Sequence, residues 1–258
     1  MHRIDRWITR APGWSYLAMA TMITWGILAP AALSAHGLIA WSPPSIWHAL
    51  GALGPWLAAL LVIAATEGRR GLRSWFAMQG RWRVGWPWLL VAGLSPLVML
   101  AIALGIDRQV DGYWPDGALL WKAPYGLGWM LINLVIALAY GFGEEPGWRG
   151  FLLPHLRQRT GLPATILLLT MAWGGWHGLM FAYRLPSEPL LVVGFFVGLL
   201  AGAIWLGWLL HRTGSILVVA LWHAVWNIVN IPAMAVSDTV LAALSTQVMI
   251  LASLIMVG

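Results

Sequence analysis

The stretch GFGEEPGWRG, residues 141–150, places two carboxylates and an arginine at the end of an apolar run. On a helix, Glu145 and Arg149 lie four residues apart with the acid first, the favourable order for an ion pair. Glu144 is turned about 100° away on a helix of 3.6 residues per turn, so we expect it to be free for chemistry. Pro146 can kink or break the helix, which could tilt Glu144 towards a shared cavity or away from it. The alternative interpretation is a cytoplasmic helix end with solvated charges.

Two further patterns place polar side chains within apolar runs. WGGWHG, residues 173–178, puts His177 deep in one run, and HAVWN, residues 223–227, puts His223 and Asn227 on one face of a helix. An ionisable group inside a membrane costs about 2.5–3.5 kcal/mol on insertion scales, so each such group needs a partner or a function. The alternative for these residues is a structural role, in packing or in hydrogen bonds between helices.

The depths of these side chains along their helices agree with one another. If the helix of the first motif continues to about residue 155 and the next begins near residue 162, a rise of 1.5 Å per residue puts Glu144 and His177 roughly 16 and 22 Å from the cytoplasmic end. His223 and Asn227 lie roughly 14 and 20 Å along their own helix. An acid, two imidazoles and an amide that share one layer suit acyl-group hydrolysis, because a buried carboxylate can activate water and an imidazole or amide can stabilise an oxyanion.

The composition of the chain places this layer in a membrane. Of 258 residues, 60% are hydrophobic and 9% charged, against about 25% charged in an ordinary soluble domain. A membrane helix needs about 20 apolar residues. We therefore predict an all-α, polytopic integral membrane protein of about eight transmembrane helices, forming a single membrane domain over residues 1–258. The predicted spans are roughly 14–35, 46–66, 86–105, 126 into the first motif, 162–181, 190–210, 214–231 and 238–257.

The basic residues predict the orientation, because Lys and Arg collect in cytoplasmic loops. With eight spans, twelve of the fifteen basic residues fall on one side and only Arg108, Lys122 and Arg184 on the other. The interpretation is a multi-pass protein of the cell membrane with both termini in the cytoplasm; a signal peptide at the basic start is the weaker alternative. The high pI then reflects the orientation in the membrane; the lipid bilayer is the expected partner, and nucleic acid is not expected as one. The twelve are Arg3, Arg6, Arg10, Arg69, Arg70, Arg73, Arg81, Arg83, Arg149, Arg157, Arg159 and Arg212.

In their order and spacing, the three patterns resemble the motifs EExxxR, FxxxH and HxxxN or HxxxD of the CPBP family, the CAAX protease and bacteriocin-processing (Abi) intramembrane proteases. The resemblance covers roughly residues 141–230, within a motif-bearing core of about 126–231. One departure is Trp173, where the family usually has Phe, and its larger ring is expected to narrow the cavity.

The resemblance implies a membrane endopeptidase that acts on a membrane-associated peptide, such as a CaaX-like tail or a leader peptide. A non-catalytic immunity or scaffold protein and, less favoured, a transporter are the alternatives from other classes. The implied roles are Glu144 as general base, His177 as the ligand that orients the water, His223 and Asn227 as the oxyanion hole, and Glu145 with Arg149 as a supporting pair.

Metal dependence stays open at this point. The family has been described both as metal-dependent and as glutamate-dependent, and Glu144, His177 and His223 could hold zinc with one open position. The chain has no cysteine and no HExxH motif, which removes cysteine-ligated zinc and the usual helix-borne zinc protease site. We favour a site without a cofactor, with Zn as the alternative.

Overall fold

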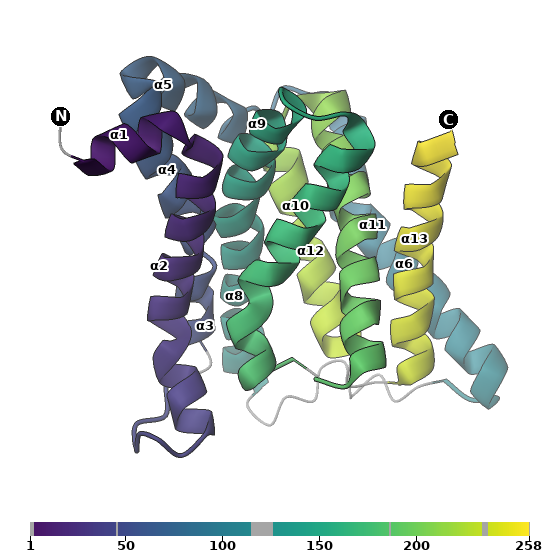
Figure 1. Ribbon diagram of the computed structural model, residues 1–258. Helices are drawn as coiled ribbons and strands as arrows, with labels where there is room; N and C mark the ends of the chain where they lie inside the picture. The colour runs from purple at the N-terminus through teal and green to yellow at the C-terminus, as the bar shows by residue number, and fades with distance from the viewer. Residues whose placement is uncertain (1–2, 45, 115–125, 186, 234–236, 258) are drawn as a thin grey trace.

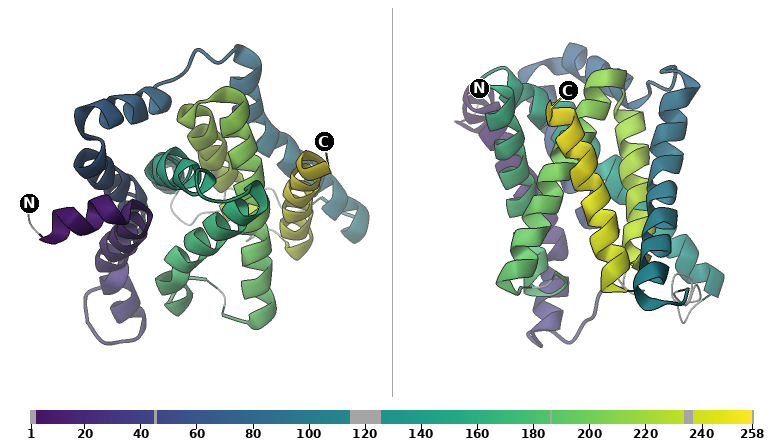
Figure 2. Two further views of the ribbon diagram at one scale, coloured as in Figure 1. Left: turned by 45° about the horizontal axis from the view of Figure 1, so that its top comes forward. Right: turned by 90° about the vertical axis from the view of Figure 1, so that its right-hand side faces the viewer.

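The computed structural model describes residues 3–44, 46–114, 126–185, 187–233 and 237–257, and these are helical without a strand (Figure 1). The long helices stand side by side as a bundle, as two further views also show (Figure 2). This confirms the predicted all-α class. The elements are α1 (Arg3–Arg10), α2 (Pro12–Ala35), α3 (Trp47–Gly51), α4 (Gly54–Thr66), α5 (Gly68–Gln79), α6 (Trp86–Asp111), α8 (Gly126–Gly147), η1 (Trp148–Leu152), α9 (Leu153–Arg157), α10 (Leu162–Trp176), η2 (His177–Ala182), α11 (Pro189–Thr213), α12 (Ile216–Ala233) and α13 (Asp238–Val257).

Six helical segments in the described residues are long and apolar enough to cross a membrane. They are Pro12–Ala35, Trp47–Thr66, Trp86–Asp111, Leu162–Ala182, Pro189–Thr213 and Asp238–Met256. The seventh predicted span corresponds to α12, whose apolar part, Ile216–Asn230, is shorter. The fourth predicted span, from residue 126 into the first motif, corresponds to α8, which begins directly after residues that the structure does not describe. The chain is thus a multi-pass membrane protein, and a count of eight spans stays a prediction.

Both termini lie at the same end of the bundle, together with α1, α5 and α9 (Figure 1). Most of the basic residues assigned to the cytoplasmic side lie on these three short elements. Arg149 was counted with them, but its side chain is fully buried inside the bundle and says nothing about topology. Lys122, counted on the opposite side, lies outside the described residues. The common end agrees with an even number of spans, whereas the side of the membrane on which it lies stays a prediction.

The outer surface of the bundle carries large apolar side chains that no other element covers. Val98 of α6, Leu131 of α8, Val193 of α11 and Leu254 of α13 are all more than half exposed. In water a surface of this kind would drive aggregation, whereas lipid tails are a suitable solvent for it. Between the helices, buried apolar side chains form a core that includes several tryptophans.

Helix α8 packs against both α12 and α4, and two glycines of its motif make this close approach possible. A Cβ on Gly141 would lie 2.3 Å from the carbonyl oxygen of Ala220 in α12, and one on Gly143 would lie 2.5 Å from the carbonyl oxygen of Ala52 beside α4. No side chain larger than hydrogen fits at such distances without a shift of the backbone. The two glycines that precede Glu144 therefore set how closely this end of α8 approaches α12 and α4.

Candidate active site

The helix that carries the first motif does not stop at Pro146. Pro146 lies inside α8, and the chain continues through a π-helical turn, η1, into α9, which ends at Arg157. Proline lacks an N–H and crowds the preceding turn, and a wider π turn next to it lets the helix go on; such turns are frequent at functional sites. The Nε1–H of Trp75, on α5, donates a 2.9 Å hydrogen bond to the carbonyl oxygen of Pro146. The continuation to about residue 155 assumed in the depth estimate is therefore present, and α5 stabilises the turn.

Glu145 and Arg149 form the ion pair expected from their spacing, at 2.9 Å between Nη1 and Oε1, with both side chains fully buried. The same Oε1 accepts a 2.6 Å contact from Nδ1 of His223 on α12. A carboxylate can only accept here, so the Nδ1 atom carries the hydrogen. Glu145 thus does more than pair with its own helix: it also orients the histidine of the third motif.

Glu144 points to a different neighbour. Its side chain is only 2% exposed, and its Oε2 accepts a 2.7 Å hydrogen bond from Nε1–H of Trp173 on α10. In the described part of the chain no other hydrogen bond engages this carboxylate. The Oε1 atom is therefore available to a water or a substrate, which is what the sequence-based role of general base requires.

His177 lies at the junction between α10 and the 3-10 turn η2. Its Nδ1 is 2.8 Å from the backbone carbonyl oxygen of Trp173. A carbonyl oxygen can only accept, so Nδ1 carries the hydrogen, and in the neutral ring Nε2 keeps a free lone pair. The ring is surrounded by Trp176 and Phe195, with centroids 4.7 and 5.1 Å away, which leaves little freedom in its orientation.

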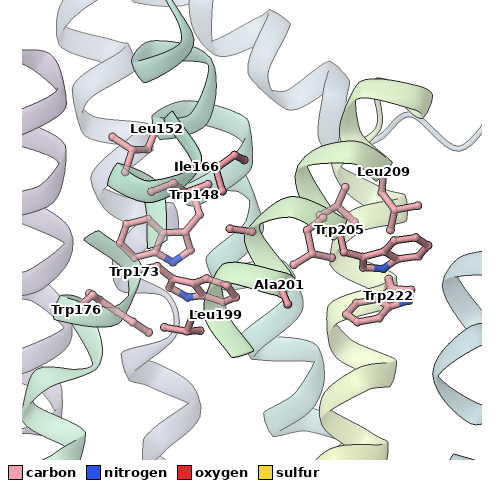
Figure 3. Packing of buried hydrophobic residues seen from close by; sticks show 14 of the residues in the cluster. Trp148, Leu152, Ile166, Trp173, Trp176, Leu199, Ala201, Trp205, Leu209 and Trp222 are labelled. Atoms are coloured by element: carbon pink, nitrogen blue, oxygen red, sulfur yellow. The ribbon is translucent and has the colours of Figure 1, made fainter. Parts of the chain in front are cut away.

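Trp173 is a common neighbour of Glu144, Arg149 and the two histidines. Its ring lies under the guanidinium of Arg149, with 4.1 Å from Cζ to the ring centroid. The rings of His177 and His223 lie 6.2 and 5.8 Å from it, centroid to centroid. Figure 3 shows Trp173 beside Trp148 and Trp176 in the packed interior, with Leu199 of α11 next to it. The three motifs therefore meet around one indole.

Asn227 is the one candidate that the structure does not draw into this arrangement. It lies one turn after His223 on α12 and is half-buried. Within the described residues it forms no hydrogen bond to the other candidates. Its predicted place in an oxyanion hole stays a prediction.

Several polar atoms beside the motif have no hydrogen-bond partner among the described residues. They are Oε2 of Glu145, Nε and Nη2 of Arg149, Nε1 of Trp148 and the hydroxyl of Tyr16, all buried. Buried polar groups are usually satisfied by protein or by ordered water. A cluster of unsatisfied donors and acceptors beside Glu144 and Glu145 thus suits a wet or substrate-binding interior better than a dry packing core.

The residues proposed as zinc ligands do not fit such an ion as arranged. Among the described residues, no group of three His, Asp or Glu side chains lies close enough to bind a metal. No step below is assigned to a metal.

Two contacts in this site could not be read from the motif spacing: the hydrogen bond of Trp173 to Glu144 and that of His223 to Glu145. One signal pointed to the first, namely a tryptophan one helical turn before His177, at a position where the resemblance leads one to expect phenylalanine. Nothing in the sequence distinguishes Glu145 from Glu144 as the partner of His223.

The fold and the site define a class: a multi-pass helical membrane protein that buries two carboxylates, an arginine and two oriented histidines within its bundle. Residues 126–229, about two fifths of the chain, match the family described as Type II CAAX prenyl endopeptidase Rce1-like. The match contains all three motifs and confirms the resemblance to the CAAX protease family. A comparison with curated proteins found no match. Since the matched family is a protease family, the match supports a membrane endopeptidase.

Proposed function

We propose that this protein is an intramembrane endopeptidase in which Glu144 activates a water molecule to hydrolyse a peptide bond. The observation that carries the proposal is the state of this carboxylate. It is buried, one oxygen is held by Trp173, and the other has no hydrogen bond within the described residues. A fixed carboxylate with one free oxygen, beside two oriented imidazoles, suits a general base.

The proposed reaction balances with these residues alone. Glu144 takes a proton from water, and the water oxygen forms a bond to the carbonyl carbon of the scissile peptide. The carbonyl electron pair moves to its oxygen, and the resulting tetrahedral oxyanion is stabilised by hydrogen-bond donors. When the oxyanion collapses, the C–N bond breaks and the proton on Glu144 passes to the leaving amine.

The histidines take supporting roles in this scheme. With its hydrogen at Nδ1, His177 offers the Nε2 lone pair as an acceptor for the attacking water. His223, held at Nδ1 by Glu145, donates from Nε2 to the oxyanion in its imidazolium form, and Asn227 adds an amide donor from the next turn. Glu145 and Arg149 fix the geometry of this half of the site.

The proposed substrate is a membrane-associated peptide of the CaaX-like or leader type. A prenylated C-terminal tail is the first choice, because the matched family is described as a CAAX prenyl endopeptidase. Such a tail would keep its lipid in the bilayer while its peptide entered between the helices. We further propose that the protein lies in the cell membrane with both termini in the cytoplasm.

The test uses the purified protein in lipid vesicles, with a quenched fluorescent peptide that ends in a prenylated CaaX sequence. Replacing Glu144 with Gln is expected to abolish cleavage, because the amide cannot accept a proton from water. Glu188→Gln is the matched control, since Glu188 is exposed in the turn before α11. Cleavage that survives in the Glu144 variant would overturn the proposal. Cleavage by the wild-type protein that is lost on treatment with a strong chelator would overturn the metal-free scheme alone.

A further inference from the structure

Trp173 makes three kinds of contact at the centre of the site, two through its side chain and one through its backbone. Its N–H donates to Glu144 at 2.7 Å, its face lies against the Arg149 guanidinium at 4.1 Å, and its backbone carbonyl accepts from His177 at 2.8 Å. The side chain is 95% buried. Packing alone would explain a large ring here, but it would not explain why the single polar atom of that ring points at the one carboxylate that the ion pair leaves free.

An indole N–H is a donor and never an acceptor. A hydrogen bond from it to Oε2 therefore restrains the carboxylate of Glu144 and leaves Oε1 as the atom that can meet a water. The cation–π contact ties the same ring to Arg149, and through Arg149 to Glu145. A phenylalanine at this position would keep the ring but could not donate to Glu144.

We propose that Trp173 is a positioning residue: its indole N–H holds Glu144 in the orientation from which Oε1 takes the proton of the attacking water. This inference deepens the proposed function and rests on it. The larger ring then does more than narrow the cavity. The proposed activity depends on a hydrogen bond to Glu144 that a phenylalanine at this position could not donate.

The experiment separates the N–H group from the size of the ring. Trp173 is replaced with benzothienylalanine, in which sulfur takes the place of the N–H while shape and aromatic face are kept. The same replacement at Trp222 is the matched control. Trp222 is also buried, and its N–H donates at 2.9 Å to the hydroxyl of Ser95, away from the carboxylates. Kinetic constants are measured per folded molecule in vesicles with the prenylated peptide, beside Glu144→Gln.

The expected result is a fall in kcat of roughly ten- to a hundredfold for the Trp173 replacement, with KM nearly unchanged, because a hydrogen bond to a charged group is lost without a change of cavity shape. The Trp222 replacement is expected to change kcat less than about twofold, because the hydrogen bond that it loses goes to the hydroxyl of Ser95 and not to a carboxylate of the site. Trp173→Phe is expected to lower kcat in the same direction and to change KM as well, since it also alters the volume of the cavity.

Two results would overturn the inference and can be told apart from a failure of the proposed function. If Glu144→Gln abolishes cleavage but the Trp173 replacement keeps wild-type kcat, or loses no more than the Trp222 replacement, the hydrogen bond positions nothing and the proposed function stands. If Glu144→Gln retains cleavage, the proposed function fails and the role of Trp173 falls with it.

Discussion

The fully buried pair of Glu145 and Arg149 supports a quantitative prediction for Arg149→Met. The substitution keeps an unbranched side chain of similar reach but removes the guanidinium. In the wild-type protein its Nη1 lies 2.9 Å from Oε1 of Glu145, and its Cζ lies 4.1 Å from the centroid of the Trp173 ring. Glu145 is then left as a buried carboxylate with His223 as its remaining partner. Removing one member of a buried pair typically costs about 3–5 kcal/mol, because the other charge stays buried without compensation.

The assay is unfolding of the purified protein in mixed micelles by titration with SDS, followed by tryptophan fluorescence. We expect Arg149→Met to lower the free energy of unfolding by about 3–5 kcal/mol. Arg157→Met serves as the control, because Arg157 is exposed at the end of α9 and, among the described residues, its side chain donates only to the nearby backbone carbonyl of Thr160. Surface substitutions of this kind usually change stability by less than about 0.5 kcal/mol.

A double-mutant cycle distinguishes a lost interaction from a general disturbance. Glu145→Gln alone leaves the guanidinium of Arg149 uncompensated, whereas the double variant removes both charges. The double variant should therefore be less destabilised than the sum of the single variants, by roughly 1–3 kcal/mol. Purely additive costs, or an Arg149→Met cost as small as that of Arg157→Met, would refute the argument that this pair stabilises the motif.

Two other predictions concern the packing and the orientation of the bundle. Gly141→Ala should destabilise the protein by about 1–3 kcal/mol in the same titration, because its Cβ would lie 2.3 Å from a carbonyl oxygen of α12. Gly128→Ala is the control, since Gly128 lies on the same helix in open space. Equal effects of the two substitutions would contradict the close-packing explanation. Because the chain has no cysteine, a single cysteine added near either terminus can be labelled alone, and an impermeant maleimide should reach it only after the membrane is opened. Ser187→Cys lies in the exposed turn between η2 and α11 and should react from outside the cell. The reverse pattern would show the opposite orientation.

The general architecture was accessible from the sequence because the two signals behind it are strong and local. Apolar runs of about 20 residues admit few structures other than a membrane helix. The spacing of Glu145 and Arg149 predicts a contact within one helix, whatever surrounds it. The resemblance to the CAAX protease family came from three ordered motifs, and the family match over residues 126–229 confirms it.

Contacts between helices were not accessible in the same way. Helical spacing gives the angle between Glu144 and Glu145, but it does not say which neighbour lies at each angle. The chain also contains twenty tryptophans, so the one that donates to Glu144 does not stand out by its type. The π turn after Pro146 depends on tertiary support from Trp75, and such support cannot be read from the residues of the turn itself.

The two adjacent carboxylates allow one helix to form hydrogen bonds with two neighbouring helices at the same depth. Because successive residues point about 100° apart, Glu145 meets α12 through His223 while Glu144 meets α10 through Trp173. Glu145 accepts from both Arg149 and His223 through a single oxygen, so moving it to activate water would break two contacts. Among the described residues, Glu144 has one hydrogen bond, and its donor is neutral. The same geometry that gives Glu145 a supporting role therefore favours Glu144 as the carboxylate that exchanges a proton in the proposed reaction.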